Sequence, residues 1–288
     1  MTDQALIVRP PVARRVLALI TTSHPGPSLA IAVMTALLAA QAAPHGARPL
    51  LAAVPMLAGQ LSVGWSNDAF DAGRDAAAGR TDKPLATGAI SARAVWTAAL
   101  VSLVAALAMA LALGAVPFLL LLVLLGAGWA YNAGLKSTAA SGLMYVLGFG
   151  PLPAYSVSTA GQGHVPTWAA TSVAALVGLG THFANVLPDL DADRGTGVRG
   201  LPQQVAARWG SRAVRAVALV LLLTASVLMV LTARPERRWV AIAGLGVSVV
   251  VAAIGARGSG KVPFVSAIAI AAIDAVLVAA GVVPIQQP

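Results

Sequence analysis

Cysteine is absent from this sequence, and charged residues are scarce. The lack of cysteine excludes disulfide bonds, thiolate metal ligands and cysteine nucleophiles. Only 10% of the 288 residues are charged, whereas 58% are hydrophobic, and the mean hydropathy is +0.82. Soluble domains usually carry about 25% charged residues. The composition therefore indicates an integral membrane protein in which lipid surrounds most of the chain.

Long apolar runs divide the chain into segments that could cross a bilayer. A spanning helix needs roughly 20 mostly apolar residues, because its backbone polar groups must bond within the helix. We expect an all-α membrane fold in which the whole chain, 1–288, forms one transmembrane domain. The runs predict about nine helices, at 27–43, 50–66, 94–113, 115–132, 142–160, 167–187, 212–232, 238–255 and 263–283.

The basic residues predict how the chain is oriented. We expect no removable signal peptide, since no small-residue cleavage site follows a short apolar core near the N-terminus. With the N-terminus in the cytoplasm, 15 of the 19 basic residues fall on that side, and only Arg48, Arg234, Arg237 and Arg238 fall outside. This predicts a multi-pass protein of the plasma membrane with its C-terminus outside. The basic residues lie in short loops, so we expect lipid headgroups and an anionic substrate as partners, and no nucleic acid.

One acidic motif occurs twice. The first copy reads NDAFDAGRDAAAG and the second NVLPDLDADRGTG, and in both an asparagine, two aspartates and a glycine follow one another at steps of four residues. The copies occupy 67–79 and 185–197, each at the end of an apolar run, with four predicted spans between them. An even number of crossings returns the chain to the same face, so the copies can meet. We therefore expect two pseudo-repeated bundles around a central cavity.

The repeated carboxylates predict a metal and diphosphate site. Residues at steps of four share one side of a helix, so Asn67, Asp71 and Asp75 should form one stripe, and Asn185, Asp189 and Asp193 a second. Oxygen ligands without histidine or cysteine favour Mg²⁺, which usually binds through one or two carboxylates together with substrate phosphates. The cations expected to bind the remaining phosphate oxygens are Arg74, Arg80, Lys83, Arg194 and Arg199. Asp68, Asp82 and Asp191 lie off the stripes, and the pattern is equally compatible with a structural or a functional role.

Three segments resemble the UbiA superfamily of intramembrane prenyltransferases: NDAFDAGRDAAAGRTDKPLATGAIS, YNAGLK and NVLPDLDADRGTGVRGLP. The resemblance extends from about residue 15 to 283. The family's first motif, Asn-x-x-x-Asp-x-x-x-Asp, falls on Asn67, Asp71 and Asp75. Its second, Asp-x-x-x-Asp, falls on Asp189 and Asp193. The family often carries Tyr-x-x-x-Lys as well, and Tyr131 and Lys136 match it with one additional residue between them.

The resemblance implies a reaction that needs metal ions. A magnesium-bound isoprenyl diphosphate would lose its diphosphate, and a lipophilic, preferably aromatic, acceptor of quinone, pigment or lipid biosynthesis would capture the allylic cation. Asp71, Asp75, Asp189 and Asp193 would be the catalytic and metal-binding residues. The substrate-binding residues would be Asn67, Asn185, Arg74, Arg80, Lys83, Tyr131, Lys136, Arg194 and Arg199. For Lys136 the alternative is a lysine that reaches toward lipid headgroups.

The pattern leaves other functions and residues open. A terpene cyclase of the same superfamily would have the same metal site. A transporter with a repeated carboxylate site is a further alternative, although transport sites lie near the middle of the membrane. Phosphatidyl-alcohol transferases keep their acids in one continuous motif, which is not the pattern here. Asp274, within the last predicted span, could be functional or could pair with a hydroxyl of a neighbouring helix. His182, Trp65 and Phe183 lie near the motifs, but packing or interfacial anchoring is the simpler interpretation.

Overall fold

The computed structural model describes residues 11–161, 165–190 and 198–287, and these residues form α-helices, two 3₁₀ turns and connecting loops. In these ranges there is no β-strand, only an isolated bridge between Pro166 and Gln286. The helices are α1 (Val12–Thr22), α2 (Pro25–Ala42), α3 (Arg48–Ala77), α4 (Ala92–Leu113), α5 (Ala115–Asn132), α6 (Ser141–Phe149), α7 (Leu152–Ser158), α8 (Trp168–Val186), α10 (Leu201–Trp209), α11 (Ser211–Thr232), α12 (Arg238–Arg257) and α13 (Val262–Ala279).

The predicted membrane segments all coincide with helices. Within the described residues, seven helices are long and apolar enough to cross a membrane. The remaining two predicted ranges correspond to α3, which continues to Ala77 with a polar C-terminal part, and to the pair α6 and α7. α6 ends at Phe149 and α7 begins at Leu152, because Pro151 has no backbone N–H with which to continue the first helix. The all-α membrane fold is confirmed, and the count of nine spans stays a prediction.

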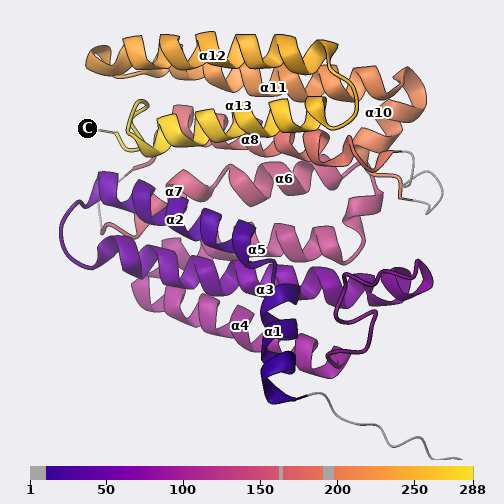
Figure 1. The fold of residues 1–288 in the computed structure, drawn as a ribbon. Helices are drawn as coiled ribbons and strands as arrows, with labels where there is room; N and C mark the ends of the chain where they lie inside the picture. The colour runs from indigo at the N-terminus through magenta and orange to yellow at the C-terminus, as the bar shows by residue number, and fades with distance from the viewer. Residues whose placement is uncertain (1–10, 162–164, 191–197, 288) are drawn as a thin grey trace, which may run out of the picture.

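The helices form two groups that lie side by side (Figure 1). α2, α3, α4 and α5 pack together in one group, and α8, α11, α12 and α13 in the other. α6 packs against both α5 and α8 and so connects the groups. The buried Tyr155 of α7 donates a hydrogen bond from its hydroxyl to the carbonyl oxygen of Ala52 on α3, at 3.0 Å. The C-terminal ends of α3 and α8, which carry the two acidic motifs, lie at the same end of the molecule (Figure 1).

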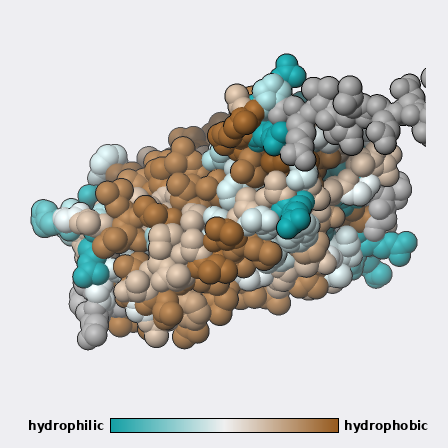
Figure 2. All heavy atoms as spheres, turned by 90° about the horizontal axis from the view of Figure 1, so that it is seen from below, coloured by the Kyte–Doolittle hydropathy of each residue, from teal (hydrophilic) through white to brown (hydrophobic). Residues whose placement is uncertain are grey.

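The outer surface of the helices is apolar. Exposed side chains include Val101, Val104 and Leu111 of α4 and Val250 and Ile254 of α12. Figure 2 shows one face of the molecule, on which hydrophobic residues cover most of the surface and hydrophilic ones gather mainly toward the ends. A surface of this kind would be costly in water and suits the hydrocarbon of a bilayer.

α1 is a helix that the apolar runs did not predict. It lies across the direction of the other helices (Figure 1), and it joins α2 through a tight corner at Ser23 and His24. His24 has a φ of +52°, in the left-handed region that residues other than glycine seldom adopt. The indole N–H of Trp65 on α3 donates to the carbonyl oxygen of Leu19, at 2.8 Å. The indole of Trp65 thus holds α1 against α3, and this packing role explains the residue without interfacial anchoring.

Close backbone contact at Gly64 fixes the position of this corner. A Cβ atom at residue 64 would lie 2.1 Å from the carbonyl oxygen of Ser23, whereas a Cβ atom at Gly73, further along α3, would meet nothing within 4 Å. The close contact between α3 and the corner at Ser23 therefore requires glycine at position 64, whereas position 73 has room for a side chain.

We expect Gly64→Ala to destabilise the protein by about 1–3 kcal/mol, because two backbone segments must move apart. The matched control is Gly73→Ala, which should leave stability unchanged or raise it by up to about 1 kcal/mol through helix propensity. Thermal unfolding of both purified variants in the same detergent measures the difference. Equal melting temperatures would contradict the close contact.

Candidate active site

A cavity of about 210 Å³ lies at the end of the molecule where α3 and α8 finish. Its walls come from both helix groups. The lining side chains are Asn67, Asp71, Arg74, Tyr131, Lys136, Tyr145, His182, Asn185, Val186, Asp189, Val198 and Gln203. Asp71 and Asp189 are 118 positions apart in the sequence (189 minus 71) and line the same cavity.

Asn67, Asp71 and Asp75 of the first acidic motif all lie on α3, as predicted. Asn67 and Asp71 line the cavity, and Arg74 joins them from the next turn. Asp75 is buried but does not belong to the lining. An α-helix has 3.6 residues per turn, so each four-residue step rotates the side chain by about 40°, and Asp75 is displaced by about 80° from Asn67. The expected straight stripe therefore turns away from the cavity at its third residue.

The helix that carries Asn185 ends before Asp189, so these two residues of the second motif do not share one continuous helix as predicted. α8 ends at Val186, and Leu187, Pro188 and Asp189 form a turn. Pro188 has no backbone N–H with which to continue the helical hydrogen bonds, and the backbone N–H of Asp189 donates to the carbonyl oxygen of Val186 at 3.1 Å. Asp189 thus reaches the cavity from a turn. Asp191, Asp193 and Arg194 lie outside the described residues.

Two cations contact the Asp71 carboxylate. Nη2 of Arg74 lies 2.8 Å from Oδ2, and Nζ of Lys136 donates to Oδ1. The Lys136 side chain is only 12% exposed, so the interpretation as a lysine that reaches toward headgroups was wrong. The additional residue between Tyr131 and Lys136 has a structural explanation. α5 ends at Asn132, Gly134 adopts a φ of +137°, and a 3₁₀ turn at Leu135–Ser137 directs Lys136 back toward α3.

A buried asparagine that the sequence analysis missed holds Asn67. Nδ2 of Asn67 donates to Oδ1 of Asn132 at 3.1 Å. Nδ2 of Asn132 in turn donates to the carbonyl oxygen of Val63 at 3.0 Å and to Oγ of Ser66 at 2.8 Å. These bonds attach the end of α5 to α3 and set the orientation of the Asn67 amide. The signal was present in the sequence, since Asn132 is a polar residue at the end of an apolar run and next to Tyr131.

Aromatic rings form the cavity wall opposite α3. The His182 ring stacks on Tyr145 with centroids 4.3 Å apart, and Tyr131 meets both rings edge-on. Hydrogen bonds connect the Tyr145 hydroxyl with the side chains of Asn185 and Tyr131. Nε2 of His182 lies 2.9 Å from Oγ of Ser141. His182 therefore packs as expected but also lines the cavity, whereas Phe183 is buried in the core of the second helix group.

Several predicted phosphate-binding cations lie outside the cavity lining. Arg80 makes a bidentate ion pair with Asp82, at 2.7 and 2.8 Å. This contact lowers the pKa of Asp82 to about 2 and raises that of Arg80, to which the charges of Asp75 and Asp189 contribute. Lys83 donates to Asp68, and Arg199 is exposed just beyond Val198.

Asp274 is buried away from the cavity lining. Oγ of Ser226 on α11 donates to its Oδ1 at 2.7 Å. Of the two alternatives for Asp274, the pairing with a hydroxyl of a neighbouring helix is therefore observed.

The family model of the UbiA prenyltransferase family matches residues 28–282. The chain belongs to this family. It is therefore a membrane prenyltransferase, and the expectation drawn from the three sequence motifs is confirmed. No curated protein sequence matches the chain significantly.

Solved structures of UbiA homologues share the fold. A structure described as giving insight into digeranylgeranylglyceryl phosphate synthase has a TM-score of 0.72 at 13% identity, over 93% of this chain and 99% of the other. A UbiA homologue from Archaeoglobus fulgidus bound to GPP and Mg²⁺ has a TM-score of 0.65 at 16% identity, over 92% and 99%. The apo structure of a UbiA homologue from Aeropyrum pernix K1 has a TM-score of 0.65 at 21% identity, over 89% and 98%.

The donor atoms around the cavity suit a hard divalent cation. Within the described residues no group of three or more histidines, cysteines or acids is close enough to form a metal site by itself. Asp71 and Asp189 nevertheless offer carboxylate oxygens to one cavity, together with the amides of Asn67 and Asn185. Mg²⁺ commonly uses one or two carboxylates and completes its shell with water and phosphate oxygens. The residues present therefore fit this ion.

We expect Asn132→Ala to lower the stability of the protein by about 1–3 kcal/mol, since buried partners lose their hydrogen bonds. It should also raise KM for the isoprenyl diphosphate, because Asn67 loses its fixed orientation. Ser102→Ala is the control, since the Ser102 hydroxyl donates to the carbonyl oxygen of Ala58 between α4 and α3, outside the cavity lining. Thermal unfolding and steady-state kinetics of both variants test this. The same KM in both variants would contradict the role of Asn132.

Proposed function

We propose that this chain catalyses the Mg²⁺-dependent transfer of an isoprenyl group from an isoprenyl diphosphate to a lipophilic, aromatic acceptor within the membrane. One observation carries the proposal. Asp71 and Asp189, from two motifs far apart in sequence, line one cavity that Arg74, Lys136 and three aromatic rings also line. Acidic and basic groups suited to a metal diphosphate are thus next to rings suited to a hydrocarbon cation.

The diphosphate would bind between the acidic and the basic side chains. Asp71 and Asp189 would hold Mg²⁺, with Asp75 and Asp193 as the further carboxylates of each motif. Mg²⁺, when bound, supplies neutralisation of the charge that develops on the leaving diphosphate. Arg74 and Lys136 would donate hydrogen bonds to diphosphate oxygens, and the amides of Asn67 and Asn185 would orient the bound group. The loop residues Arg80, Lys83, Arg194 and Arg199 would contribute positive charge around it.

Ionisation would break the bond between the allylic carbon and the diphosphate oxygen, and the electron pair would leave with the diphosphate. The faces of Tyr131, Tyr145 and His182 would stabilise the allylic cation, because aromatic rings attract positive charge over their faces. A nucleophilic carbon of the acceptor would then bond to the cation and lose a proton. The walls formed by α3, α5, α6 and α8 would limit access of water, which would otherwise capture the cation.

The surface and the charges support a proposal for the location of the reaction. The exposed apolar side chains support insertion in a membrane, where both substrates are soluble. Arg74, Arg80, Lys83, Lys136 and Arg199 all belong to the end that holds the cavity, and cytoplasmic loops are enriched in such residues. We therefore propose that the site faces the cytoplasm of a plasma membrane, with the C-terminus outside.

Identification of the organic product tests the proposal. Purified protein is incubated with Mg²⁺, isoprenyl diphosphates of several lengths and aromatic lipophilic acceptors, and the products are analysed by mass spectrometry. The expected result is an adduct whose mass is the sum of acceptor and isoprenyl group less one proton. A cyclic hydrocarbon formed without any acceptor would favour the terpene cyclase. Movement of an intact diphosphate across vesicles without any product would favour a transporter.

Asp71→Ala and Asp189→Ala should each leave the protein in the membrane but reduce Mg²⁺-dependent diphosphate release by at least about a hundredfold, since charge stabilisation in the transition state is lost. Diphosphate release by the membrane fraction, normalised to protein level, measures this. Full activity in either variant would contradict the role of that carboxylate.

Lys136→Gln should raise KM for the isoprenyl diphosphate by about tenfold while the variant remains folded, because an amide makes a weaker hydrogen bond to a phosphate oxygen than an ammonium does. The comparison is with Lys261→Gln, which removes an exposed cation from the start of α13. Initial rates over a range of diphosphate concentrations measure both. A KM that changes equally in the two variants would indicate a general charge effect and contradict a direct contact.

A further inference from the structure

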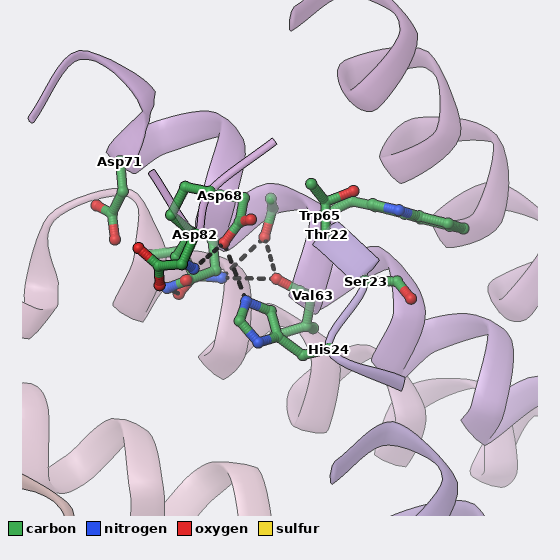
Figure 3. A network of polar contacts seen from close by, with 12 residues as sticks. Thr22, Ser23, His24, Val63, Trp65, Asp68, Asp71 and Asp82 are labelled. Atoms are coloured by element: carbon green, nitrogen blue, oxygen red, sulfur yellow. Dashed lines mark hydrogen bonds and ion pairs between the residues drawn. The ribbon is translucent and has the colours of Figure 1, made fainter. Parts of the chain in front are cut away.

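Asp68 is more deeply buried than Asp71 and Asp75, although it lies off the acidic stripe. Its side chain is only 3% exposed. Oδ1 accepts a hydrogen bond from Nζ of Lys83 at 2.7 Å and lies 2.9 Å from Nε2 of His24. Figure 3 shows the Asp68 carboxylate directed toward His24, with Asp71 apart from this cluster. Three separate segments thus meet at one buried acid.

The Asp68 side chain points in a different direction from the side chains of α3 that line the cavity. It follows Asn67 directly on α3, so its side chain is rotated by about 100° from that of Asn67. Asn67, Asp71 and Arg74 line the cavity, and Asp68 does not. Both groups that contact its Oδ1 are side chains of other segments. Asp68 is therefore oriented to bind protein groups and not a ligand in this cavity.

A small apolar core surrounds this polar contact. Ala18 and Leu19 of α1, Trp65 and Ala69 of α3, and the residues Leu85, Ala89 and Ile90 pack together with Val95 of α4. The segment 78–91, which joins α3 to α4, is thus held against α3 and α1. Asp68 and Lys83 form the ion pair within this contact, and His24, in its left-handed conformation, completes it from the corner between α1 and α2.

The same segment carries a cation close to the acidic motifs. The backbone N–H of Arg80 donates to the carbonyl oxygen of Asp75 at 3.0 Å, and the Arg80 guanidinium lies within electrostatic reach of Asp75 and Asp189. Arg80 and Lys83 are three residues apart, so a shift of Lys83 would also move Arg80. The ion pair between Asp68 and Lys83 therefore helps to hold the segment that carries this positive charge.

We propose that Asp68 is a positioning residue that does not bind the metal, but holds the 78–91 segment through Lys83 so that its positive charge assists diphosphate binding. This inference rests on the proposed function and deepens it. Under this proposal, two acids of the first motif have different roles. Asp71 faces the ligand, and Asp68 acts through Lys83 on the segment that surrounds the ligand.

Two binding measurements on the full chain in detergent distinguish these roles. Mn²⁺ binding is followed by electron paramagnetic resonance, first without and then with inorganic diphosphate. For Asp68→Asn we expect the Mn²⁺ affinity without diphosphate to stay within about twofold of the wild type, and the diphosphate affinity at saturating Mn²⁺ to fall by about tenfold. Asp71→Asn should instead lose Mn²⁺ affinity. Glu236→Gln, an exposed acid in another loop, is the control and should match the wild type in both.

A double-mutant cycle tests whether Asp68 acts through Lys83. Lys83→Gln should reproduce the effect of Asp68→Asn, and the double variant should be no weaker than either single variant, because both break the same contact. Additive losses would overturn the proposal. So would a loss of Mn²⁺ affinity in Asp68→Asn equal to that in Asp71→Asn, or an unchanged diphosphate affinity. If Asp68→Asn fails to fold, Lys83→Gln tests the same prediction by itself.

Measurements on the wild-type protein distinguish failure of the inference on Asp68 from failure of the proposed function. If it binds Mn²⁺ and diphosphate but Asp68→Asn behaves like the wild type, only the inference on Asp68 fails. If the wild type itself binds no diphosphate in the presence of Mn²⁺, the proposed function fails and the inference fails with it.

Discussion

The cavity end of α3 buries two carboxylates, Asp68 and Asp71, within one helical turn, and each of them has at least one cationic side chain in contact. Taking a carboxylate out of water is unfavourable unless a cation and hydrogen bonds replace the lost hydration. Lys136 and Arg74 do so for Asp71, and Lys83 and His24 for Asp68. Because these partners come from four different places in the sequence, the pairing determines how the loops and α1 pack around the site.

The two pairings have different consequences. The cavity that contains Asp71 also contains Asp189, so Arg74 and Lys136 can exchange a carboxylate for a phosphate oxygen without leaving the site. Asp68 lies among apolar side chains and has no such second partner in the cavity. One pair can therefore rearrange when a charged ligand binds, whereas the other maintains the arrangement of the surrounding segments. The hydrogen bonds of Asn132 and the close contact at Gly64 support the same end of α3 from two further sides.

Much of the site could be predicted from sequence because helical residues at fixed spacing share a side. Asn67 and Asp71 were found in this way, as was the return of Asn185 and Asp189 to the same end of the molecule. Residue spacing predicted side-chain positions wrongly where a helix ends or where helical rotation accumulates. Pro188 follows the end of α8, so Asp189 reaches the cavity from a turn, and accumulated helical rotation takes Asp75 out of the lining. Lys136 is the opposite case. Its spacing from Tyr131 departs from the family pattern, yet the break in the helix at Gly134 directs it into the site.

The sequence by itself determined the membrane environment, the helical segments, the family and the acidic residues of the site, because hydropathy and periodicity are properties of residues close together in the chain. Only the tertiary structure decided which cation neutralises which acid, that Asn132 holds Asn67, and that Asp68 faces a small apolar core while Asp71 faces the cavity. Such contacts join residues up to 69 positions apart. They depend on how helices rotate and approach one another, which no local pattern specifies.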